Sequence, residues 1–324
     1  MGLARNALIA ASQSQWLREH AMRWRFVRRA SRRFLPGERY EDALAAARDL
    51  EALGIGSMLS RVGENIAEAA EAEAVAEHYA TVLAAMQSAG LPGSLSIKPT
   101  QLGLDLDAGL CRRNLERMLD ASEMAPADKR GVIWIDMESS AYVDRTLELY
   151  RGARTRHSNV GVCLQSYLRR TPADIDSLLP LGPVIRLVKG AYHEPASIAF
   201  PAKRDVDEAF FALAQKLLSA ESLSSGTRAA FATHDPKLIE RVVQLVTSDS
   251  TSDSKKTRGQ SAAGSRVEFQ TLYGIRRDLQ RQLAADGWPV SVLISYGTYW
   301  FPWYMRRLAE RPANVWFVVK NIFG

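Results

Sequence analysis

The stretch GVIWIDMESS, residues 131–140, carries the clearest fold signal in the chain: a short apolar run that ends directly at the acidic Asp136. PVIRLVKGAY, residues 183–192, repeats this pattern with an apolar run that ends at Lys189. Short β-rich runs of this kind are typical of buried parallel strands. Both stretches therefore predict strands with ionisable groups at or near their C-terminal ends.

Outward from these two stretches, the chain contains eight short apolar runs, and most are followed by a segment with helical spacing. The expected strands lie within 56–60, 94–103, 131–140, 159–168, 183–192, 228–235, 266–274 and 289–297. The expected helices lie within 36–54, 66–90, 112–123, 142–151, 205–221, 236–247, 275–286 and 300–310. This period predicts an α/β fold, a (β/α)8 TIM-type barrel with extra N-terminal helices. A doubly wound sheet is the alternative, but the chain has no GxGxxG after a strand.

The domain organisation follows from the same pattern. Residues 1–50 are expected to form an N-terminal helical segment, and residues 51–324 the barrel. The low-complexity stretch 248–265, rich in serine, cannot build a core, and we expect a surface insertion without a catalytic role.

Composition narrows the function classes. The chain has 324 residues, of which 47% are hydrophobic, and its net charge is +6. The basic excess lies at the N-terminus, where eight arginines and one acid occur between Arg5 and Arg33. The two cysteines, Cys111 and Cys163, offer no metal-ligand spacing or disulfide framework, so buried thiols in a reducing compartment are expected. No apolar run reaches the ~20 residues needed to span a bilayer, and we expect a cytoplasmic protein.

Polar side chains recur near the expected C-terminal ends of the strands, which is where TIM barrels carry their active sites. They are Glu64, Lys98, Asp136, Gln165, Arg186, Lys189, His234, Glu268 and Gln270. Positive and negative groups around one mouth suit an anionic, zwitterionic or phosphorylated ligand. Taken singly, each has another interpretation: Lys98 could form a Schiff base or an ion pair, Asp136 could cap a helix, and His234 could be a core histidine. No set of residues has metal-ligand spacing, so no metal is expected.

The segment WYMRRLAERP, residues 303–312, places Arg306 and Arg307 side by side in an expected helix. Neighbouring helical residues point ~100° apart. Two guanidinium groups can therefore approach one carboxylate from two sides. The alternative is a solvated helix face with an Arg306–Glu310 pair.

Taken together, the segments resemble the proline dehydrogenase family. The resemblance rests on SIKPTQLGLDLD, IDMES, LQSYLRRTPAD, RLVKGAYHEP, FATHD, VEFQTLYGI and YGTYWFPWYMRRLAERP, in that order. It implies a distorted (β/α)8 barrel that binds FAD at its C-terminal mouth. It also implies oxidation of L-proline to 1-pyrroline-5-carboxylate by hydride transfer to FAD N5, with electrons passed to a quinone-type acceptor.

The resemblance also implies roles for single residues. Arg306 and Arg307 match the residues that bind the substrate carboxylate, with Glu64 as their acidic partner. Lys98, Asp136 and Arg186 match the catalytic positions, with Arg186 near the flavin N5. The implied FAD contacts are Gln165, Arg186, Lys189, Gly190, Ala191, Thr233, His234 and Glu268.

Two positions depart from the family pattern, and both belong to the expected substrate pocket. Leu293 and Trp303 stand where the family commonly has tyrosines. The same chemistry on a proline analogue or another cyclic or secondary amine, in a dedicated biosynthetic pathway, is therefore the alternative to proline catabolism.

Two readings from other classes stay open. A barrel lyase would use Lys98 as a Schiff base. A non-catalytic binder would use the basic N-terminus, which could also make weak contact with the inner face of a membrane; such contact would fit a quinone acceptor. Nucleic acid is not an expected partner.

Overall fold

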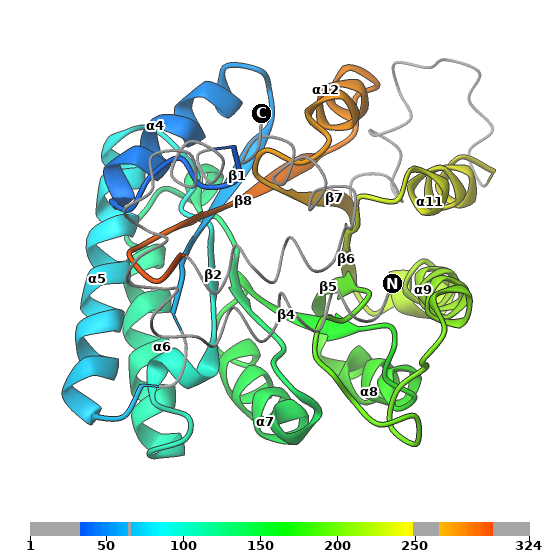
Figure 1. Ribbon diagram of the computed structural model, residues 1–324, viewed down its shortest axis with the longest axis horizontal. Helices are drawn as coiled ribbons and strands as arrows, with labels where there is room; N and C mark the ends of the chain where they lie inside the picture. The colour runs from blue at the N-terminus through cyan, green and yellow to red at the C-terminus, as the bar shows by residue number, and fades with distance from the viewer. Residues whose placement is uncertain (1–32, 64–65, 249–265, 301–324) are drawn as a thin grey trace, which may run out of the picture.

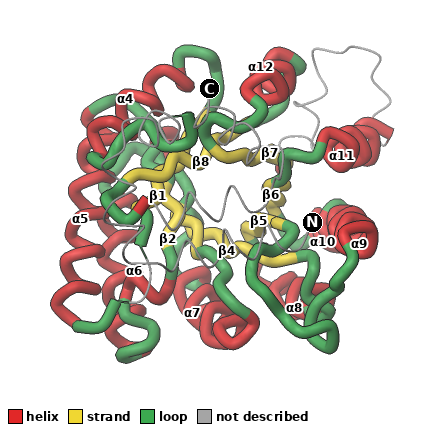
Figure 2. The backbone as a smooth tube through the Cα atoms, in the orientation of Figure 1, coloured by secondary structure: helices red, strands yellow, loops and turns green. Residues whose placement is uncertain are grey.

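The computed structural model describes residues 33–63, 66–248 and 266–300. Eight parallel strands close into one barrel in sequence order, each paired with the next, and β8 pairs with β1 (Figure 2). The strands are β1 (Gly56–Arg61), β2 (Leu95–Ile97), β3 (Ile133–Ile135), β4 (Val160–Gln165), β5 (Val184–Val188), β6 (Arg228–Ala232), β7 (Val267–Leu272) and β8 (Val290–Tyr296). The predicted fold class and all eight strands are confirmed.

Helices surround this ring of strands (Figure 1). They are α4 (Tyr40–Glu51), α5 (Ala69–Ser88), α6 (Ala108–Glu123), α7 (Val143–Arg154), α8 (Thr171–Leu178), α9 (Lys203–Leu217), α10 (Ala220–Ser224), α11 (Pro236–Ser248) and α12 (Arg277–Ala285). Short 3-10 turns include η1 (Pro99–Leu102) and η3 (Ser140–Tyr142). Helix α4 contacts β1 and β8 and so covers the outside of the barrel before its first strand.

Helix α8 was not predicted. It has eight residues and follows β4 after a turn of arginines. Pro172 lies in its first turn, where a proline costs no hydrogen bond, and Thr171 Oγ1 donates to the carbonyl oxygen of Gln165 at 2.6 Å. The helix therefore begins next to the end of β4 and holds that end in place.

The core has two parts because strand side chains alternate between faces. Residues such as Leu59, Ile97 and Ile135 pack outward in the large cluster between strands and helices. Met58, Trp134, Val184 and Ala230 form a smaller cluster of their own. Met58 Sδ lies 3.3 Å from Arg186 Nη1, so this second cluster adjoins the strand residues that face the barrel axis.

Several expectations fall outside the described residues: most of the 300–310 helix, the 249–265 stretch and the first 32 residues. Cys111 and Cys163 are buried and free of disulfides, as predicted. In the part of the chain that the structure describes, no helix has the length and apolar character to cross a membrane.

Candidate active site

A cavity of about 320 Å³ lies at the C-terminal ends of the strands. Most of the side chains that the sequence predicted for the site line it. These are Lys98, Asp136, Gln165, Arg186, Lys189, Gly190, Ala191, His234 and Leu293. The volume lies within the range of small-molecule sites, ~300–1,000 Å³. The residues predicted from the alternation of apolar runs and polar ends therefore meet in one cavity at this end of the barrel.

Arg186 and Asp136 form an ion pair at the base of the cavity, across β5 and the end of β3. The hydroxyl of Ser96 joins both: Arg186 Nη2 donates to it at 2.9 Å, and it donates to Asp136 Oδ1 at 2.7 Å. Arg186 is 3% exposed, and a charge buried to this degree is costly unless paired. The three side chains therefore form one hydrogen-bonded unit.

Arg186 also packs against an aromatic ring inside the barrel. Its guanidinium carbon lies 5.0 Å from the ring centroid of Trp134, in cation–π geometry. Its Nε atom is buried and has no hydrogen-bond partner among the described residues. Arg186 thus combines two satisfied Nη groups with one unsatisfied donor.

Lys98 directly follows β2. Its Nζ donates to the carbonyl oxygen of Gly63 at 3.3 Å, at the end of β1. Gln101 Nε2 donates to the same carbonyl at 2.8 Å. The turn that carries Lys98 is therefore tied to the neighbouring strand end, and its ammonium group lies on the β1 side of the cavity.

Gln165, the last residue of β4, is 2% exposed. Its Nε2 donates to the carbonyl oxygens of Met137 and Glu138 at 3.3 and 3.2 Å. Its Oε1 has no hydrogen-bond partner among the described residues. A buried acceptor in a residue that lines a cavity is a natural contact for an N–H group of a ligand.

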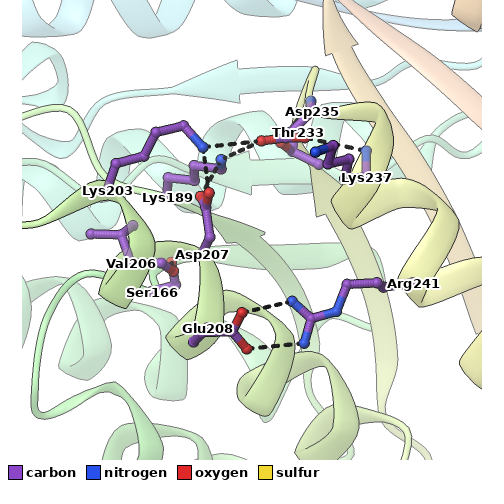
Figure 3. A network of polar contacts seen from close by, with 10 residues as sticks. All are labelled: Ser166, Lys189, Lys203, Val206, Asp207, Glu208, Thr233, Asp235, Lys237 and Arg241. Carbon is purple, nitrogen blue, oxygen red and sulfur yellow. Dashed lines mark hydrogen bonds and ion pairs between the residues drawn. The ribbon is translucent and has the colours of Figure 1, made fainter.

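Lys189 belongs to a network of two lysines and two aspartates at the edge of the cavity (Figure 3). Its Nζ lies 2.5 Å from Asp207 and 3.2 Å from Asp235, and Lys203 contacts the same two carboxylates. Burial raises the pKa of each aspartate, but the hydrogen bonds from the lysines outweigh it and hold both pKa values below the ordinary value. Both carboxylates are therefore charged at neutral pH.

Gly190 and Ala191 turn the chain away from β5 and form a wall of the cavity. Gly190 has φ +115°, and a Cβ there would meet the Tyr167 ring at 2.3 Å. Farther along this loop, the Glu194 carboxylate accepts the N–H and the hydroxyl of Ser140 at 2.7 and 2.6 Å. This loop is thus packed closely against Tyr167 at Gly190 and is tied to Ser140 through Glu194.

His234 and Thr233 follow β6, but only His234 lines the cavity. His234 Nε2 accepts the backbone N–H of Leu272 at 2.9 Å, so this nitrogen carries no proton. Thr233 is buried, and its hydroxyl accepts the N–H of Asp235 at 3.2 Å. Of these two predicted FAD contacts, His234 lines the cavity, whereas Thr233 stabilises the turn that follows β6.

Glu268 does not lie at a strand end, and this part of the prediction is corrected. It is the second residue of β7, which continues to Leu272. It lines a separate space of about 70 Å³, together with Trp134, Arg228 and Arg266. The strand continues past Glu268 through Phe269 and Thr271, which favour β-structure, so the residues of β7 that line the C-terminal mouth are Gln270, Thr271 and Leu272.

Leu293, in β8, lines the cavity and packs against the Met58 cluster. Glu64, Trp303, Arg306 and Arg307 lie outside the described residues. Ser96 and Tyr192 were not predicted as site residues. Ser96 precedes Lys98 by two positions, so the two-residue period of a strand could have found it.

The described residues hold no group of three or more His, Cys, Asp or Glu side chains placed to bind a metal ion. The site instead offers one buried ion pair, a nearby lysine, an unsatisfied acceptor and an unsatisfied donor. Such a set can hold a polar heterocycle and a charged small molecule side by side.

The chain matches known proteins in sequence and in fold. The sequence model of the family described as proline dehydrogenase matches residues 43–320. Proline dehydrogenase 1 of Bacillus subtilis strain 168 is 36% identical over 320 residues, which cover 99% of each chain. Proline dehydrogenase of Deinococcus radiodurans is 38% identical over 295 residues, covering 90% of this chain and 89% of that one.

Solved structures of proline utilization A share the fold. The protein from Bdellovibrio bacteriovorus, inactivated by N-propargylglycine, aligns with a TM-score of 0.75 at 18% identity. The alignment covers 95% of this chain and 36% of that longer chain, and at this identity it shows a shared fold. The family match over most of the length, together with full-length relatives, establishes that the chain belongs to the proline dehydrogenase family.

Proposed function

We propose that this protein binds FAD in the cavity at the barrel mouth and oxidises L-proline to 1-pyrroline-5-carboxylate. The observation that carries the proposal is the buried Arg186–Asp136–Ser96 unit, with Lys98 on the same cavity, in a chain of the proline dehydrogenase family. Family relatives named proline dehydrogenase support the substrate class.

The cavity residues fit a flavin ring. An isoalloxazine carries both hydrogen-bond donors and acceptors along its edge. Gln165 Oε1 is an unsatisfied acceptor and Arg186 Nε an unsatisfied donor among the described residues. Lys189 and His234 also line the cavity. We assign Gln165, Arg186, Lys189, Gly190, Ala191 and His234 to FAD binding, with Thr233 shaping the turn beside them.

The chemistry that bound FAD supplies is acceptance at N5 of a hydride from the carbon beside the substrate amine. The protein residues contribute charge and orientation. The positive Arg186 favours an electron-rich reduced ring. A positive Lys98 near the substrate amine lowers the pKa of that amine and favours its unprotonated form. Asp136 holds Arg186 in place and keeps the site from carrying two uncompensated positive charges.

The substrate carboxylate is assigned to Arg306 and Arg307, with Glu64 as their acidic partner. This assignment rests on the family motif, since these residues lie outside the described part of the chain. We further propose a quinone-type electron acceptor, and weak contact of the basic N-terminus with the inner membrane face. Co-sedimentation with anionic vesicles, compared between the full chain and one without residues 1–32, tests the membrane contact.

The experiment that tests the main proposal is anaerobic reduction of the FAD-loaded protein. L-Proline is expected to bleach the oxidised flavin band, and borohydride is expected to trap no substrate on Lys98. Borohydride trapping without bleaching would instead support a Schiff-base lyase.

A different amine is the second candidate substrate, because Leu293 lines the cavity where the family commonly has a tyrosine. Bleaching by 4-hydroxyproline, pipecolate or a simple secondary amine, with proline inert, would establish it. Under this alternative, Leu293→Tyr shifts the preference back toward proline. Losing or gaining a pocket contact of this size changes kcat/KM ratios by ~10- to 200-fold.

A further inference from the structure

A line of polar contacts runs from the charged base of the cavity toward the opposite end of the barrel. Arg186 Nη1 donates to Gln270 Oε1 at 3.5 Å, and Gln270 Nε2 donates to Glu268 Oε1 at 3.2 Å. Gln270 lines the mouth cavity, whereas Glu268 lines the separate space at the other end. The two residues stand two positions apart on β7, so their side chains share a face.

The hydrogen-bond donors and acceptors along this line can be arranged in only one way. A guanidinium can only donate hydrogen bonds and a carboxylate can only accept them. The amide of Gln270 therefore turns its oxygen to Arg186 and its nitrogen to Glu268. With an apolar residue at 268, the buried amide nitrogen would lose its acceptor and the amide would be free to turn.

The position of Glu268 is unusual for a barrel. Barrel interiors are filled mainly by apolar side chains, and here Trp134, Val184 and Ala230 are among them. Trp134 also lines the space beside Glu268. A carboxylate next to such a layer costs free energy unless it has a partner. Its contact with Gln270, which is 2% exposed, provides one.

We propose that Glu268 is a positioning residue for Arg186: acting through Gln270, it fixes the direction in which the guanidinium faces the mouth cavity. The inference rests on the proposed role of Arg186 beside FAD. It replaces the cofactor contact that the sequence predicted for Glu268 with an indirect role from the far end of the barrel.

The test compares Glu268→Met, which has similar length but no acceptor, with Glu268→Gln, which keeps an acceptor and removes the charge. The measurements are FAD midpoint potential, kcat/KM for L-proline and the free energy of unfolding. A misdirected Arg186 stabilises reduced FAD less, so Glu268→Met lowers the potential. For Glu268→Met we expect the equilibrium between oxidised and reduced FAD to change roughly tenfold, which lowers the midpoint potential by about 30 mV for two electrons. We also expect a roughly tenfold loss of kcat/KM. Glu268→Gln is expected to keep a midpoint potential and a kcat/KM close to those of the wild type.

If Glu268 acted only through its charge, its removal would raise the FAD midpoint potential, because loss of a nearby carboxylate favours the electron-rich reduced ring. Equal upward shifts of the potential in both Glu268 variants would therefore overturn the proposal. The double variant Glu268→Met with Gln270→Met separates the positioning effect from the charge effect further. If Glu268 acts through Gln270, its substitution has no added effect once Gln270 is lost. A full Glu268→Met effect in that background would also contradict it.

Gln270→Met alone tests the same link if Glu268→Met does not fold, and it too is expected to lower the potential. Wild-type protein that neither binds FAD nor is reduced by proline would overturn the proposed function and this inference together. A wild-type protein reduced by proline, with unchanged potentials in all variants, would overturn the inference alone.

Discussion

The carboxylate of Glu138 accepts both the backbone N–H and the hydroxyl of Thr100, at 3.0 and 2.8 Å. Glu138 lies after β3 and Thr100 lies in η1 after β2, so this pair ties two neighbouring strand ends together. Each end also carries a proposed catalytic residue, Asp136 and Lys98. The pair therefore sets the distance between them.

Glu138→Gln is expected to destabilise the protein and reduce turnover. An amide nitrogen, which can only donate, replaces one of the two carboxylate oxygens, so one of the two Thr100 donors loses its charged acceptor in a buried site, at a cost of about 1–3 kcal/mol. Urea unfolding measures the stability, and kcat and KM for proline report the site. Thr100→Ser, which keeps both donors, is the matched control and should stay within about 1 kcal/mol of wild type. Equal behaviour of the two variants would contradict the tie.

Gly190→Ala is expected to cost about 2 kcal/mol or more, because φ is +115° and the new Cβ would meet the Tyr167 ring. The displaced wall should also weaken FAD binding. Gly152→Ala is the control: it lies in α7, and nothing stands within 4 Å of its Cβ position. This change should stabilise the helix by about 0.5–1 kcal/mol. Thermal unfolding is expected to show a loss of stability for Gly190→Ala and a gain for Gly152→Ala. A change of stability in the same direction for both variants would contradict the account.

Lys189→Met is expected to weaken FAD affinity about tenfold, as loss of one charged hydrogen bond does. Lys203→Met is the matched control because Lys203 contacts the same aspartates but does not line the cavity. Its side chain is 74% exposed, so its loss should change the affinity far less. Quenching of FAD fluorescence on titration gives both constants. Equal losses would mean that Lys189 acts only through the network in Figure 3.

His157 predicts a pH dependence of stability. Burial lowers its pKa, but hydrogen bonds to Glu123 and Glu116, at 2.7 and 3.1 Å, outweigh this and raise the pKa above the ordinary value. A raised histidine pKa stabilises the fold fully below the unfolded value of about 6.5. The contribution is lost as pH rises through the folded pKa.

The free energy of unfolding should therefore fall between about pH 6.5 and the folded pKa. His157→Gln should remove this part of the dependence, with a loss of about 1–3 kcal/mol at low pH. The exposed His193→Gln is the control and should keep the wild-type profile. Urea unfolding across the pH series measures all three proteins, and parallel profiles for wild type and His157→Gln would refute the assignment.

Much of the barrel could be predicted because most strands are apolar runs, and Lys98 and Asp136 directly follow two of them. The error at Glu268 has the same origin. The run VEFQTL contains polar residues that face the barrel interior, so the sequence pattern places a strand end at Glu268, inside β7. Helix α8 was missed although Pro172 in its first turn was a start signal.

The pairing of Arg186 with Asp136 and Ser96 could not be predicted from position alone. It joins β5 to β2 and β3 across the barrel, and such contacts depend on the closure and stagger of all the strands. The same holds for the link between Gln270 and Arg186. Family resemblance supplied the roles of single residues, whereas the contacts that hold them came from the structure.

The most direct test of the central claim is a single anaerobic turnover of the FAD-loaded protein with L-proline, followed by mass analysis of the product. The account predicts one equivalent of cyclic imine, two hydrogens lighter than proline, for each FAD reduced. It also predicts loss of this reaction in Arg186→Met protein that still folds. Proline recovered unchanged beside oxidised FAD would contradict the account.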